Sequence, residues 1–253
     1  MTSQVPRIFS PRRRALRLAR ALARQRRDEA ARFVWEDMAE EMAERLAFVR
    51  HEPKRTLVIG PCPSPLGDYL ARGGGHVEDG NAIDPESPFP ASGFDFIAVL
   101  GQLDAVNDLP GALIHLRNAL EPGGLVIASF VGGQSLPSLR AAMLAAEPDR
   151  PAARMHPLVD HRAAPGLLQR AGWKDPVVDT QTLTIRYSAL DVLVSDLRDQ
   201  ALGNALADAG SPIGKVALAR ARAAFLDRAD EGGKVPERIE IVTLTGRRSL
   251  AGT

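Results

Sequence analysis

Residues 56–75 combine a feature of nucleotide-binding sites with a feature that opposes one. An apolar run, residues 57–59, leads directly to Gly60, as a buried strand does when it enters a turn that holds a nucleotide. Proline stands at positions 61, 63 and 65, where such a turn normally has glycines. Proline fixes φ at about −65° and removes an amide donor, so this turn is stiff and poor in donors. The sequence therefore raises the question of whether the turn can hold a cofactor.

Two histidines lie close to charged residues further along the chain. Asp160 and Arg162 flank His161, and His156 lies four residues before Asp160. Histidines five residues apart share a helix face less well than histidines four apart, and Pro157 favours a loop. We therefore predict no metal site here, and an ordinary loop or the lining of a substrate pocket instead.

A third polar group lies on a helix that we predict over residues 189–207. It comprises Asp196, Arg198 and Asn204. Residues two apart do not face each other on a helix, so an ion pair between Asp196 and Arg198 is not expected. Contact with a substrate or partner, or packing against the N-terminal helix, remains open for these side chains.

Arginine is concentrated near the N-terminus. Residues 11–27 hold eight arginines and no acid, whereas residues 28–44 hold seven acids and one arginine. Apolar residues recur at helical spacing in both stretches, which predicts two amphipathic helices, the second ended by Pro53. The arginines are then either the solvated face of a docked helix or, over residues 12–27, a contact with an acidic protein surface, acidic lipid or RNA.

Strand and helix signals alternate from residue 56 onward. Short apolar runs predict strands, and periodic runs between them predict helices. The expected strands are 56–60, 94–101, 125–130, 176–187 and 238–248, and the expected helices are 66–71, 108–120, 136–146, 164–171, 189–207 and 215–228. This alternation predicts one α/β domain over residues 53–253, a mainly parallel sheet with helices on both faces, and a helical extension over residues 1–52.

The composition narrows the class of protein. The chain has 253 residues, 45% of them hydrophobic, and a net charge of +1, so a substantial core is expected and a general polyanion binder is not. We expect no integral membrane segment, because no run approaches the ~20 apolar residues that span a bilayer. The one cysteine, Cys62, suits a reducing compartment; no His or Lys adjoins it, which predicts a buried, unreactive thiol. These features predict a cytoplasmic protein, with peripheral attachment at the inner membrane as the alternative.

Several longer stretches carry a family resemblance. VNDLPGAL (106–113), LEPGG (120–124) and SDLRDQALGNAL (195–206) lie in order, among others that together cover most of the chain. They resemble the class I S-adenosylmethionine (SAM)-dependent methyltransferases. The resemblance is to the branch of the complex I assembly factor and its alphaproteobacterial relatives, and more distantly to the malonyl carrier-protein methyltransferases. LEPGG is common to many methyltransferases, whereas the other two motifs are more specific to that branch.

The resemblance implies a Rossmann-like fold and the positions of a SAM site. The first strand of the family ends in an acid, and Val58 stands at that position. Asp79, or Glu78 in its place, is the candidate for the ribose, and Asp84 is the candidate for the adenine. Together, the positions expected at the cofactor are Gly60, Cys62, Ser64, Asp79, Asp84, Gly101 and Gln102.

Several functions remain open from the sequence. The resemblance implies SAM-dependent methyl transfer, or arginine hydroxylation on a subunit of respiratory complex I. The proline turn and the missing acid favour impaired SAM binding, as does the short segment 67–94, where one strand–helix unit is expected to be shortened or missing. The alternative is a non-catalytic assembly or adaptor protein, whose partner is a complex I subunit or another protein. A weaker alternative is nucleic-acid binding through residues 12–27, which the 5% aromatic content disfavours.

Overall fold

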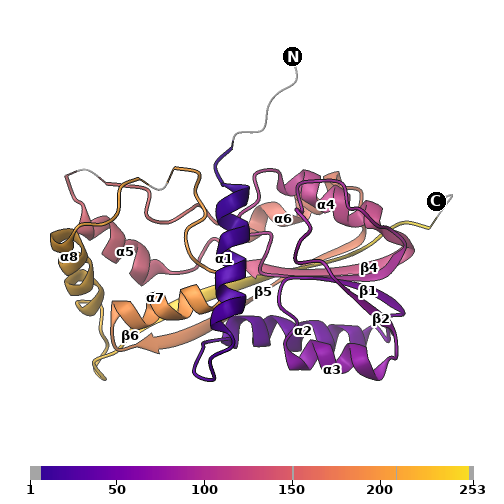
Figure 1. The fold of residues 1–253 in the computed structure, drawn as a ribbon, viewed down its shortest axis with the longest axis horizontal. Helices are drawn as coiled ribbons and strands as arrows, with labels where there is room; N and C mark the ends of the chain where they lie inside the picture. The colour runs from indigo at the N-terminus through magenta and orange to yellow at the C-terminus, as the bar shows by residue number, and fades with distance from the viewer. Residues whose placement is uncertain (1–6, 150, 209, 251–253) are drawn as a thin grey trace, which may run out of the picture.

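The strands of the chain form a single sheet in a computed structural model that describes residues 7–149, 151–208 and 210–250 (Figure 1). The sheet order is β2-β1-β3-β4-β6-β5. Neighbouring strands among β1 to β4 pair in parallel, and β6 runs antiparallel to β4 and β5. The predicted mainly parallel α/β sheet is confirmed. Its strands are β1 (Arg55–Ile59), β2 (His76–Asp79), β3 (Phe94–Leu100), β4 (Leu120–Val131), β5 (Lys174–Tyr187) and β6 (Val235–Arg247).

Helices cover both faces of the sheet. Successive side chains of a strand point to opposite faces, and those of β3 divide accordingly: Phe96 and Ala98 join one hydrophobic cluster, and Ile97 and Val99 join the other. Figure 1 shows α4 and α6 on one side of the sheet and α2 and α3 on the other. The helices are α1 (Pro11–Arg24), α2 (Phe33–Phe48), α3 (Ser64–Arg72), α4 (Leu109–Ala119), α5 (Pro137–Ala146), α6 (Ala164–Arg170), α7 (Leu190–Asp199) and α8 (Lys215–Leu226), with a 3₁₀ turn at His161–Ala163 before α6.

The segment after α3 is short, as the sequence predicts. It contains the four-residue strand β2, which the sequence did not predict, and residues 80–93 then reach β3 without a helix or strand. β2 lies at the edge of the sheet and pairs only with β1, and most of its residues are exposed. An edge strand exposed in this way has no apolar run, which is why it left no signal in the sequence.

The two predicted N-terminal helices are confirmed as α1 and α2, and both join the core. Leu18 and Ala21 of α1 and Trp35 and Met38 of α2 belong to the same cluster as Phe96 of β3. Figure 1 shows α1 crossing the front of the molecule, and its contacts are mainly with α7. The boundary at residue 52 stays a prediction. None of the helices described is long and apolar enough to cross a membrane.

Two local predictions are wrong. The helix predicted to residue 207 ends at Asp199, because the backbone enters the left-handed region at Ala201 (φ 55°) and the Asn204 side chain then bonds to Ala153 and Arg154. Cys62 is exposed, because the chain leaves the sheet after β1 and crosses the surface before α3 begins. The turn still desolvates the sulfur enough to raise the pKa of the thiol, so an unreactive Cys62 remains expected.

Candidate functional site

The topology brings three of the predicted cofactor positions to the carboxyl edge of the sheet. Gly60 follows β1, Asp79 ends β2, and Gly101 follows β3. This is the edge at which open α/β sheets bind ligands. Gly60 has φ 105°, and a Cβ there would collide with the Leu100 carbonyl oxygen, so only glycine fits.

The backbone donor of this turn is bonded to the protein itself. The Gly60 amide donates to Asn81 Oδ1 at 2.9 Å, and the Asn81 amide donates to Asp79 Oδ1 at 2.8 Å. Cys62 and Ser64 are both exposed, and Ser64 begins α3. Asn81 therefore holds the amide that a nucleotide would otherwise meet at this edge.

The predicted adenine-side acid is bonded to α1. Arg14 lies almost fully buried, with its side chain 6% exposed, 2.5 Å from Asp84 Oδ1 and 2.7 Å from Glu86 Oε2. Arg14 also donates to the Ala105 carbonyl. Burial by itself raises the pKa of Glu86, but the Arg14 charge and donated hydrogen bonds, including the Asn107 amide, lower it overall. Asp84 and Glu86 thus anchor a helix of the same chain.

A second arginine of α1 reaches a fully buried acid. Arg17 Nη2 and Nη1 lie 3.0 and 3.1 Å from the two oxygens of Asp104, and Arg17 also donates to the Gly203 carbonyl. His156 Nε2 lies 3.5 Å from Asp104 Oδ2, without hydrogen-bond geometry. Burial by itself raises the pKa of Asp104, but the Arg17 charge, with the neighbouring His156, outweighs it and lowers that pKa. Arg17, Asp104 and His156 therefore form one buried charge cluster beneath α1.

Of the two remaining cofactor positions, Gly101 lies against Trp35 of α2. Gly101 has φ 66°, and a Cβ added there would lie 3.3 Å from Trp35 Nε1. Gln102 is buried, and its side-chain amide donates weakly, at 3.4 Å, to the Leu100 carbonyl. Within the described ranges Trp35 Nε1 is a buried donor with no hydrogen-bond partner. This donor would suit a bound acceptor at this edge.

Taken together, these residues do not fit SAM. Val58 offers no carboxylate, the Gly60 amide is bonded to Asn81, and Asp84 is bonded to Arg14. Asp79 alone has the right type and position, at the end of β2. The cavities described next are lined by none of the seven predicted cofactor residues.

Three of the six residues predicted at a substrate or partner lie together. A cavity of about 280 Å³ has His156, Arg198 and Asn204 in its wall, and most of its other lining residues are apolar. The other three residues lie elsewhere. Asp160 and Arg162 form an exposed ion pair of 3.0 Å with each other. Asp196 lies half-buried on α7, where burial raises its pKa.

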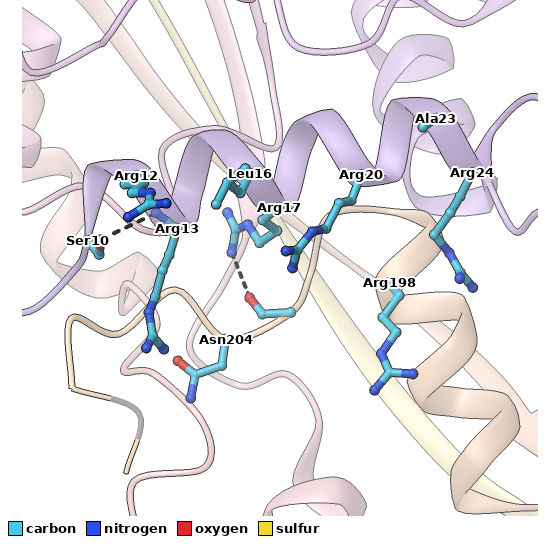
Figure 2. Close-up of a pocket in the computed structure, with 11 residues that line it drawn as sticks. Ser10, Arg12, Arg13, Leu16, Arg17, Arg20, Ala23, Arg24, Arg198 and Asn204 are labelled. Carbon is cyan, nitrogen blue, oxygen red and sulfur yellow. Dashed lines mark hydrogen bonds between the residues drawn. The ribbon is translucent and has the colours of Figure 1, made fainter. Parts of the chain in front are cut away.

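A larger cavity of about 890 Å³ adjoins the first and lies between α1 and α7. Figure 2 shows arginines extending from one side of α1 toward Arg198 and Asn204. Of the described residues that line this cavity, six are arginines and none is acidic. They are Arg12, Arg13, Arg17, Arg20, Arg24 and Arg198.

No protein-family model matches the chain, but individual relatives do. The rat mitochondrial arginine-hydroxylase NDUFAF5 is 28% identical over 63% of this chain. The malonyl-(acyl-carrier protein) O-methyltransferase of Halorhodospira halophila is 29% identical over 91% of this chain and 86% of its own. The chain is therefore similar in sequence to class I methyltransferase-like proteins. This methyltransferase-like chain spans about half the length of its NDUFAF5 relatives, 48% of the rat protein. Among solved structures, the 1,6-didemethyltoxoflavin-N1-methyltransferase of Burkholderia thailandensis is 13% identical, with a TM-score of 0.48 over 93% of this chain and 88% of its own.

The sequence of this methyltransferase-like chain did not single out three residues that shape the site. Asp104 and Asn81 each bond to a distant part of the chain, and Trp35 covers Gly101. Asp104 follows β3 within the stretch that carries the family resemblance, which is a signal that could have drawn attention to it. Asn81 is two residues beyond the predicted ribose acid and has no motif of its own.

Proposed function

We propose that this methyltransferase-like chain acts without SAM, as a non-catalytic assembly or adaptor protein. The observation that carries the proposal is the bonding at the carboxyl edge of the sheet. Arg14 takes Asp84, and Asn81 takes the Gly60 amide, so bound SAM would have to displace contacts that the protein makes with itself. The Arg14 side chain is only 6% exposed, so taking Asp84 from it would leave a buried guanidinium with less compensation.

The partner in this proposal is a protein. The resemblance to the complex I assembly branch supports a subunit of respiratory complex I as the first candidate, and the NDUFAF5 relatives at about 28% identity point to the same branch. Co-purification of the tagged chain with membranes and soluble extracts of its own source would test this part. Recovery of a stoichiometric protein partner supports an adaptor.

The decisive experiment is a calorimetric titration of the purified chain with SAM and S-adenosylhomocysteine. We expect no saturable heat up to millimolar ligand and no rise in melting temperature. Asp79→Ala serves as the matched variant, because Asp79 is the acid placed best for a ribose. One-to-one binding that this substitution abolishes would overturn the proposal and favour a SAM-dependent enzyme.

A second variant separates two causes of impaired SAM binding: the Arg14 contact with Asp84, and the missing acid and glycines of the turn. Arg14→Ala frees Asp84 and Glu86 but leaves Val58 and the proline turn as they are. We expect this variant to bind SAM no better than the natural chain, because a freed carboxylate does not supply the missing acid or the glycines. Gained binding would show that α1 alone closes the site.

A further inference from the structure

The two cavities described above share part of their walls. Arg198, Gly203 and Asn204 line both the arginine cavity, about 890 Å³, and the apolar cavity, about 280 Å³. The larger lies within the size range of ligand pockets, about 300–1,000 Å³, and the smaller lies just below it. A ligand that crossed the shared wall would therefore meet a cationic region and an apolar region in turn.

The arginines of the first cavity fall into two groups. Arg17 pairs with Asp104 and Arg24 pairs with Asp199. Among the residues that the structure describes, the other four side chains make no hydrogen bond or ion pair, and all four are exposed: Arg12, Arg13, Arg20 and Arg198. Positions 13, 17, 20 and 24 follow helical spacing, which gathers these like charges on one side of α1 (Figure 2). Like charges held together repel each other, so an anion bound between them would be stabilised.

The second cavity is mostly apolar, and three of its polar side chains, Asn204, Asp104 and Arg154, are bonded to the protein itself. The Asn204 amide donates to the Ala153 and Arg154 carbonyls, and Asp104 is paired with Arg17. Arg154 is paired with Glu147. The rest of the wall includes the apolar side chains Leu139, Met143, Leu158, Val194, Leu197 and Leu202. Such a wall suits an apolar chain, and a methionine in it can adapt to the shape of that chain.

We propose that the joined cavities bind an amphiphile with a phosphate head group, the head between Arg20 and Arg198 and the apolar chain in the neighbouring cavity. Guanidinium groups match the oxygens of a phosphate two at a time, and several of them suit a dianion. The phosphate belongs either to a phosphorylated small molecule or to the head group of a phospholipid. This inference goes beyond the proposed function, and the SAM titration leaves it untouched.

The first test is a titration with alkyl phosphates below their critical micelle concentrations, by calorimetry. We expect decyl phosphate to bind at least about tenfold more tightly than inorganic phosphate or decyl alcohol, because each buried methylene strengthens binding about fourfold. Octyl phosphate should lie between hexyl and decyl phosphate. Equal affinity for inorganic and decyl phosphate would overturn the proposal.

Two pairs of variants locate the head and the tail. Arg20→Ala/Arg198→Ala should weaken decyl phosphate about tenfold or more, whereas Arg26→Ala/Arg72→Ala, two exposed arginines outside the cavity, should not. Met143→Gln should reduce the gain per methylene, whereas Leu144→Gln, on the exposed side of the same helix, should not. Circular dichroism checks that every variant is folded. Loss in the control variants equal to that in the test variants would place the ligand elsewhere and overturn the proposal.

A vesicle experiment distinguishes the two sources of the phosphate. Co-sedimentation with phosphatidylcholine vesicles that contain phosphatidic acid, lost in Arg20→Ala/Arg198→Ala, identifies a lipid head group. Binding of decyl phosphate without co-sedimentation identifies a phosphorylated small molecule. Binding of polyglutamate with none of decyl phosphate would mean that the arginines meet an acidic protein surface, and the proposal would fail.

Discussion

The buried and the exposed arginines around α1 face opposite situations. Toward the carboxyl edge of the sheet, Arg14 and Arg17 are buried and bonded to acids from distant parts of the chain. Toward α7, Arg20 and Arg198 are exposed, and within the described residues their side chains have no bonded partner. The same helix therefore bonds to acids at the carboxyl edge of the sheet through its buried arginines and lines a cationic cavity with its exposed ones.

An arginine of α1 takes its role from the residues that the fold brings to it. The arginines that the sequence groups together divide by the acids that the fold brings to them. Residues 84 and 86 pair with Arg14, residue 104 pairs with Arg17, and Asp199 lies at the C-terminal end of α1. An arginine that no acid contacts keeps a charge that an anionic ligand could neutralise.

The largest loss of stability is expected from substitution of Arg17, whose partner Asp104 is deeply buried. Arg17→Ala leaves Asp104, whose side chain is 1% exposed, buried without its partner. We expect a loss of about 3–5 kcal/mol in the free energy of unfolding, because an uncompensated buried charge is strongly destabilising. Urea denaturation measures it. The double variant Arg17→Met/Asp104→Leu should recover much of the loss, and a loss below about 1 kcal/mol in the single variant would show that Asp104 is not buried in solution.

A smaller effect is expected from Arg14→Ala. Its partner Asp84 is 42% exposed, so solvent screens part of that interaction, while Glu86 is nearly buried. We expect a loss of about 1–3 kcal/mol in the free energy of unfolding, smaller than for Arg17→Ala. A loss larger than that of Arg17→Ala would reverse the order of burial on which the comparison rests.

The pH dependence of stability should come from the acids that pair with the buried arginines of α1. The pKa values of Asp104 and Glu86 are lowered in the folded chain, so the folded state binds fewer protons than the unfolded state near these values. Their contribution is therefore complete above the unfolded pKa values, about 3.9 and 4.3, and is lost as the pH falls below them. Urea denaturation between pH 6 and pH 3 measures this loss. Asp104→Asn should reduce the slope below pH 4, and an unchanged slope would contradict the assignment.

The sequence predicted the elements better than the contacts between them. Continuous apolar runs located β1 and β3, and helical spacing located α1 and α2, because these signals depend on neighbours in the sequence. The end of α7 was missed, since it depends on a left-handed Ala201 and on Asn204 bonds to residues about fifty positions away. The strand β4 begins at Leu120, five residues before the predicted start, because Leu120 pairs with Phe94 ahead of an irregularity in the register between that pair and Leu125–Phe96.

The same reasoning explains what was found of the site. The edge that gathers Gly60, Asp79 and Gly101 follows from parallel topology and was predictable. Arg14 and Asp84 are 70 positions apart, and Arg17 and Asp104 are 87 apart. No spacing rule connects such pairs, so the sequence could name the acids of the cofactor edge but not the arginines that hold them.

The smallest effect on stability is expected from substitution of the exposed Arg20. Arg20 is exposed, and in the described part of the chain its side chain has no bond to lose, so Arg20→Ala should change the free energy of unfolding by no more than about 0.5 kcal/mol. Removing one of several like charges relieves repulsion, so the change should be neutral or slightly stabilising. The same variant should weaken decyl phosphate binding, which separates a ligand role from a structural one. Urea denaturation beside the alkyl phosphate titration checks both. A stability loss comparable to that of Arg14→Ala would mean that Arg20 also anchors the helix, and the contrast between buried and exposed arginines would disappear.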